Sequence, residues 1–179
     1  MGFLQSFKTA FASTNDNSGE LNSYLANAKS NIKQAHTHIK TFLEGVRDFQ
    51  PARRHEQLYD EEIKNKLVSI KTLLFEGAVL IDKKLKNESL REGRIKNTEE
   101  LKKLVDYSIN EIKIDDAEKD NGIIKKLQVE MWSDDRVKRG FPRPNNKELL
   151  INNLEESRKY MKEISSNLEN YNMLANVSG

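Results

Sequence analysis

One apolar heptad pattern constrains what this chain can fold into more than any other feature. Between residues 21 and 49, apolar side chains recur in alternating steps of four and three over four heptads. The nine positions are Leu21, Leu25, Ala28, Ile32, Ala35, Ile39, Phe42, Val46 and Phe49. A seam of this period is typical of a helix that packs along its length against other helices. The pattern predicts a helix over residues 20–50, which Pro51 ends.

A second predicted helix begins near Asp60 and is the most apolar part of the chain. Its apolar positions form a seam that neighbouring side chains widen into an arc. They are Ile63, Leu67, Val68, Ile70, Leu73, Leu74, Phe75, Ala78, Val79, Leu80 and Ile81. An arc this wide predicts a helix covered on most sides, as in the centre of a bundle. The remaining strip is polar (Asn65, Ser69, Thr72, Glu76 and Lys83), so we interpret Glu76 as solvent-facing rather than catalytic.

Two later helices are predicted from their start signals. Asn97 with Glu100, and Asn145 with Glu148, fit the capping box, in which a cap residue and an acid three residues later satisfy helix N–H groups. The last helix repeats the four-three seam. Its positions are Leu150, Leu154, Ser157, Met161, Ile164, Leu168, Tyr171 and Ala175.

Two stretches between these helices are less regular. Residues 113–132 fit either a helix, which we favour, or a β-hairpin around Asn121, which would be marginal on its own. Residues 133–146 contain two prolines and a glycine and predict a long loop.

A short amphipathic helix is predicted over residues 2–12, with Phe3, Phe7 and Phe11 on one face. This apolar stripe fits a lid on the end of a bundle, a partner-binding helix or an interfacial membrane anchor. Twelve residues with one lysine hold a membrane weakly, so we favour the lid, with the partner helix second.

These elements together predict an all-α fold: an elongated antiparallel bundle of about four main helices with the short N-terminal helix laid against it. The alternative is an extended coiled coil that closes only as a dimer. We expect a single domain over residues 1–179. Eight glycines and three prolines are too few for the turns of a β-sandwich or barrel.

The sequence predicts a cytoplasmic location. Its longest apolar run, residues 73–81, is far shorter than the roughly 20 residues that span a bilayer. A secretory signal needs an uninterrupted apolar run, and polar residues break up the apolar residues of the N-terminal segment, which therefore does not resemble one. The chain has no cysteine, which agrees with a reducing compartment.

No motif in the sequence predicts catalysis, so we expect no enzymatic activity, no metal and no cofactor. Phosphate-binding glycine loops, nucleophile elbows and zinc-protease motifs are all missing from the sequence. His36 and His38 are two residues apart, which on a helix turns their rings in different directions. We expect both to be solvent-exposed, His36 beside the seam and His38 outward. The acidic run over residues 115–122 fails as a calcium loop, because an alanine and a glutamine fall where acids are needed.

The candidate partner-binding residues lie in the predicted loop, where aromatic and basic side chains alternate. They are Trp132, Arg136, Lys138, Arg139, Phe141 and Arg143. Protein partners and single-stranded nucleic acids both use such surfaces. The alternative, which we favour, is that the two aromatic residues pin the loop onto the bundle while the cations stay solvated.

A second candidate is a basic patch within residues 83–103. Its residues are Lys83, Lys84, Lys86, Arg91, Arg94 and Lys96. If it folds beside the loop 132–144, the combined patch could neutralise several phosphates. The whole chain has a net charge of only +2, which removes the global argument for nucleic-acid binding.

The function that we expect first is a non-catalytic interaction or assembly module: an adaptor, a structural component or a stoichiometric inhibitor. It would act through helix faces and the aromatic and basic loop, on an unidentified protein or on a second copy of itself. A nucleic-acid-binding protein that uses residues 83–103 and 132–144 is the second hypothesis. A peripheral membrane protein that uses the N-terminal helix is the third.

Overall fold

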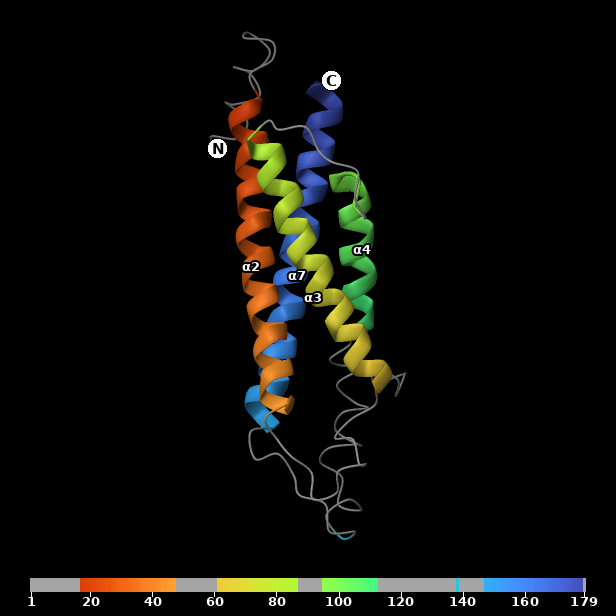
Figure 1. Ribbon diagram of the computed structural model, residues 1–179. Helices are drawn as coiled ribbons and strands as arrows, with labels where there is room; N and C mark the ends of the chain where they lie inside the picture. The colour runs from red at the N-terminus through yellow and green to blue at the C-terminus, as the bar shows by residue number, and fades with distance from the viewer. Residues whose placement is uncertain (1–16, 48–60, 87–94, 113–137, 139–146, 179) are drawn as a thin grey trace.

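The computed structural model describes residues 17–47, 61–86, 95–112, 138 and 147–178, and the structural statements below concern these residues (Figure 1). Within these ranges the structure contains four long helices and no strand: α2 (Ser18–Arg47), α3 (Glu61–Leu85), α4 (Thr98–Glu111) and α7 (Lys147–Ser178). The predicted all-α helical bundle is confirmed. The predicted N-terminal helix and residues 113–132 lie outside this part of the chain.

Successive helices run in opposite directions along one elongated bundle (Figure 1). α2 packs against both α3 and α7, and α4 packs against α7 and less extensively against α3. Contacts between helices show the antiparallel order: His38 of α2 meets Asn153 near the start of α7, and Thr98 at the start of α4 meets Asn172 near the end of α7. The four helices therefore form an antiparallel ring around one core.

The core follows the two predicted heptad seams. The buried seam residues are Leu25, Ala28, Ile32, Ala35, Ile39 and Phe42 in α2, and Leu150, Leu154, Met161, Ile164 and Leu168 in α7. Near the end of α7 the buried residue is Leu174, while the predicted seam positions Tyr171 and Ala175 are half-buried. Ser157, the one polar member of the second seam, is fully buried and donates its hydroxyl hydrogen bond to the Leu154 carbonyl at 2.7 Å. α2 and α7, the two helices that carry these seams, pack together more extensively than any other pair of helices.

The predicted cap of α4 is present, with one difference. The Asn97 side chain accepts a hydrogen bond from the Glu100 backbone N–H at 2.8 Å and so starts the helix at Thr98. The Glu100 carboxylate, however, accepts from the backbone N–H of Lys96, one residue before the cap. Two N–H groups at the helix start are satisfied in this way.

Helix α3 is not the covered central helix that its apolar arc predicted. Leu67, Ile70, Leu74, Leu80 and Ile81 are buried, but three members of the arc are exposed: Val68 by 42%, Phe75 by 62% and Val79 by 41%. The physical reason is the ring arrangement: α2 and α4 cover only the inner side of α3, and no described helix lies on its outer side. The arc is therefore wider than the neighbours can cover.

Gly77 permits the close approach of α3 to the rest of the core. A Cβ atom at this position would lie 3.0 Å from Cδ1 of Leu101 on α4 and 3.4 Å from Cδ1 of Ile32 on α2. Both distances are shorter than or at the edge of ordinary packing, so a side chain here would push against two helices.

Candidate docking surface on helix α3

The candidate functional site is a row of exposed side chains on the outer face of α3, which we call the α3 stripe. It consists of Val68, Thr72, Phe75 and Val79, and all four residues are exposed. Their spacing of four, three and four keeps them within about 60° of arc on the helix surface. The stripe lies on the side of α3 turned away from its buried residues, so α3 is apolar on two opposite faces.

Thr72 fits an apolar row because its hydroxyl is already used. It donates a hydrogen bond to the Val68 carbonyl at 3.0 Å, one turn earlier in the same helix. Covering Thr72 with another protein would therefore not strand an unsatisfied donor, the usual cost of burying a hydroxyl group. The stripe is thus chemically suited to being buried over its whole length.

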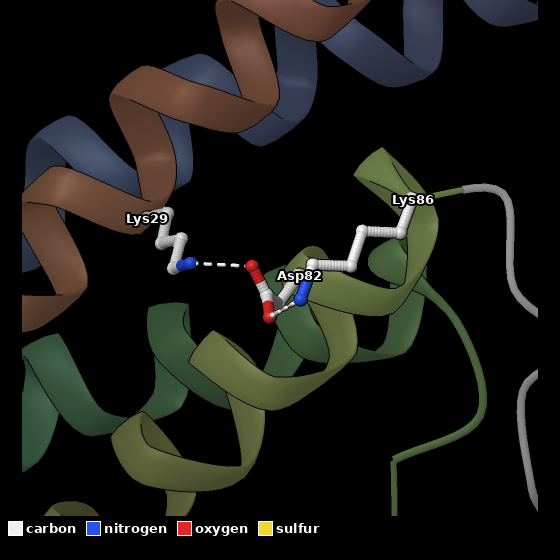
Figure 2. Close-up of polar contacts among 3 residues, drawn as sticks. All are labelled: Lys29, Asp82 and Lys86. Atoms are coloured by element: carbon white, nitrogen blue, oxygen red, sulfur yellow. Dashed lines mark hydrogen bonds and ion pairs between the residues drawn. The ribbon is translucent and has the colours of Figure 1, made fainter.

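An ion pair between α2 and α3 holds one end of the stripe in place (Figure 2). Asp82 of α3 accepts from Lys29 of α2 at 2.5 Å and pairs with Lys86, one turn later in α3, at 3.2 Å. Hydrogen bonds from Lys29 and then Lys86 lower the pKa of Asp82 below its ordinary value. The carboxylate therefore stays charged at neutral pH and ties the C-terminal half of α3 to α2.

A second ion pair holds the other end. Lys66 of α3 lies 2.9 Å from Glu111 at the end of α4. The same carboxylate accepts a hydrogen bond from Tyr107, which raises the pKa of the phenol above its ordinary value. The buried face of α3 sets the rotation of the helix about its own axis, and the contacts of Lys66 with α4 and of Asp82 with α2 agree with it, so the stripe faces outward.

Most of the predicted loop and N-terminal site residues lie outside the described part of the chain. These are Trp132, Arg136, Arg139, Phe141, Arg143, Phe3, Phe7 and Phe11. Lys138 is described: it is exposed and its own backbone is helical, while the rest of the predicted loop lies outside the described residues.

The predicted basic patch is divided among different contacts. Lys84 places its ammonium group 5.7 Å from the centre of the Tyr171 ring on α7, whereas Lys86 pairs with Asp82. Lys83 is half-buried and Lys96 is exposed, while Arg91 and Arg94 lie outside the described residues. Lys83 and Lys86, three residues apart, share a face of α3, whereas Lys84 turns toward α7.

The prediction for His38 was wrong. Its ring is half-buried between α2 and α7, where Nδ1 forms a 2.8 Å hydrogen bond with Oδ1 of Asn153 and the ring stacks on Tyr160 with centroids 5.8 Å apart. His38 lies on the side of α2 that faces α7. The heptad pattern of α2 alone does not show that α7 packs on this side. His36, which was also expected to be exposed, is half-buried on the other side, toward α3, where burial, then Lys71 and Lys40, lower its pKa.

Two further searches concern the described residues alone. Among them no group of three or more His, Cys, Asp or Glu side chains is arranged to hold a metal ion. None of the four described helices combines the length and apolar content needed to cross a membrane.

Sequence reasoning missed the α3 stripe, although a signal for it was present. Val68, Thr72, Phe75 and Val79 form a heptad seam of their own, separate from the seam that includes Leu67, Ile70, Leu74 and Ile81. Two seams on opposite faces indicate two packing surfaces, one of which the bundle itself uses.

Comparison of the chain with protein-family models, with curated proteins and with solved structures found no match. The functional argument below therefore starts from the α3 stripe and its surroundings.

Proposed function

We propose that this protein is a non-catalytic interaction or assembly module and that the α3 stripe is its docking surface. The observation that carries the proposal is the contiguous row of exposed apolar side chains centred on Phe75. A contiguous apolar patch, unlike single exposed apolar residues, is a common feature of a binding surface. The buried face of α3 holds this row in a fixed orientation, which favours binding without a large ordering cost.

The chemistry of the stripe specifies the kind of partner. A straight row of two valines, a threonine and a phenylalanine along a helix is complementary to the apolar face of another helix. Fully burying a side chain such as Val or Phe contributes about 1.5–3 kcal/mol. We therefore propose a protein partner that offers an amphipathic helix, and a cytoplasmic location, which the absence of cysteine supports.

Site-specific photo-crosslinking in cells tests this function. A photoreactive benzoylphenylalanine replaces Phe75 in one variant and Thr37, which is exposed on the polar outer side of α2, in the matched control. We expect a discrete protein adduct from position 75, little or none from position 37, and a weaker adduct when Val79→Glu is added. Equal adducts from both positions, or no adduct from position 75, would contradict the proposal.

A further inference from the structure

The α3 stripe is self-complementary in its spacing. Val68 and Val79 lie at equal distances from a point between Leu73 and Leu74, and so do Thr72 and Phe75. If a second α3 is laid antiparallel on the first about a two-fold axis through that point, Val68 meets Val79 of the second copy. Thr72 meets Phe75 of the second copy in the same way, so the outer layers pair valine with valine and the inner layers pair a small side chain with a large one.

The ends of the same helix are complementary in charge. Continuing the four-three spacing outward reaches Asn65 and Glu61 at one end, and Asp82 and Lys86 at the other. The two-fold arrangement brings Asn65 opposite Asp82 of the second copy, a carboxylate that already pairs with Lys29 and Lys86 of its own chain. It also brings the position of Glu61 opposite that of Lys86 in the second copy, so the sequence sets an acidic residue against a basic one at both ends of the interface.

The flanking positions introduce no repulsion. In this register Lys71 lies beside Ala78 of the second copy, and Glu76 lies beside Ser69 of the second copy. Neither side of the seam sets like charges against each other, the arrangement that normally excludes a wrong pairing.

We infer that the occupant of the α3 stripe is a second copy of this chain, packed antiparallel through α3 with Val68 against Val79 and Thr72 against Phe75. The inference rests on the proposed function, whose docking surface it keeps and whose partner it names. One helix face from each copy is a small interface beside the roughly 800 Å² per partner of a standard stable complex. The dimer is therefore weak, and its population depends on concentration.

Sedimentation velocity of the full chain over a wide concentration range tests the inference. We expect the wild type to pass from monomer to dimer and Phe75→Glu to weaken the dimer by about thirtyfold or more, as for a central interface residue. Thr37→Glu on α2 is the matched control and leaves association unchanged. Circular dichroism on each variant verifies that the bundle is folded.

A charge exchange tests the register. Glu61→Lys or Lys86→Glu alone is expected to weaken the dimer on the order of three- to fivefold, the usual size of an exposed pair. The double variant restores it. Within one α3 these residues are separated by about 37 Å of helix, so a rescue can arise only between copies. Lys33→Glu, a reversal on the exposed side of α2, is the control for net charge.

Three results would overturn the inference. One is a monomer at every attainable concentration, and another is a dimer that Phe75→Glu leaves intact. The third is a double variant that dimerises no better than the single ones. A monomer whose position 75 cross-links to a different protein would reject the second copy while still supporting the proposed docking function. A monomer with no adduct at position 75 would reject both.

Discussion

The contribution of a residue to this bundle depends on the helix face on which it lies. Gly77, at a tightly packed position, and Phe75, at an exposed one, are the clearest contrast. Both are in α3, two residues apart, yet a side chain at the first would meet side chains of α2 and α4, while the second is 62% exposed. Substitutions at such neighbouring positions separate residues needed for the fold from residues available for binding.

Replacing Gly77 with valine is expected to destabilise the bundle by about 1–3 kcal/mol, because the added methyl groups overpack the contact with Leu101 and Ile32. Gly19, near the start of α2, has nothing within 4 Å of its Cβ position and supplies the control. Gly19→Val should change the free energy of unfolding by much less in urea titrations. Equal effects at the two glycines would contradict the close packing described for α3.

His36 makes the stability depend on pH in a defined direction. Burial, then Lys71 and Lys40, lower its pKa below the ordinary value of 6.5, so the folded state binds fewer protons than the unfolded chain in the window just below that value. Stability therefore falls as pH decreases through 6.5 toward the folded-state pKa. We expect His36→Gln to reduce this loss in urea titrations at neutral and mildly acidic pH. An unchanged pH slope would show that His36 is not its source.

At the scale of one helix, α3 combines a face needed for stability with a face that is not. Leu74 is fully buried, and Leu74→Ala is expected to cost about 2–5 kcal/mol of unfolding free energy. Phe75→Ala, on the outer face, should change stability by less than about 0.5 kcal/mol at concentrations where the chain is monomeric. Thermal melts of the two variants provide the comparison. A large loss for Phe75→Ala would mean that the α3 stripe is covered within the chain.

The start of α4 depends on a single side chain. Asn97→Ala removes the acceptor for the Glu100 N–H and is expected to cost about 0.5–2 kcal/mol, as for other helix caps. Asn22→Ala, an exposed asparagine inside α2, is the control and should not destabilise, because alanine favours the helix. If the two substitutions have the same effect on the urea midpoint, the cap is not important to α4.

At the scale of the whole molecule, the α2–α7 pair is the main structural unit and the α3–α4 contact is the smallest in the ring. Amide protons in the middle of α2 and α7, near Ile32 and Met161, are therefore expected to exchange with solvent most slowly. Native-state hydrogen exchange followed by NMR measures this directly. Slowest exchange in α4 would place the stable unit elsewhere.

The seams show how far sequence reasoning reaches at this scale. Residues such as Ile39 and Leu154 were correctly predicted as buried, because the period of a helix marks its apolar face without reference to its neighbours. Val68, Phe75 and His38 were not placed correctly, because their surroundings depend on which other helices lie beside them. The candidate site was missed for the same reason: a second apolar face becomes visible as a surface only when the ring of helices is known.

The pairing of α2 with α7 also bears on how the chain folds. The two helices with the largest shared interface are separated along the chain by α3 and α4, so forming that interface closes a long loop, whose entropic cost precedes its contacts. Contacts between distant segments slow folding compared with a bundle of sequential neighbours. During synthesis on the ribosome, the apolar seam of α2 therefore lacks its main packing partner until α7 has been made. The bundle is complete only after α7 is synthesised.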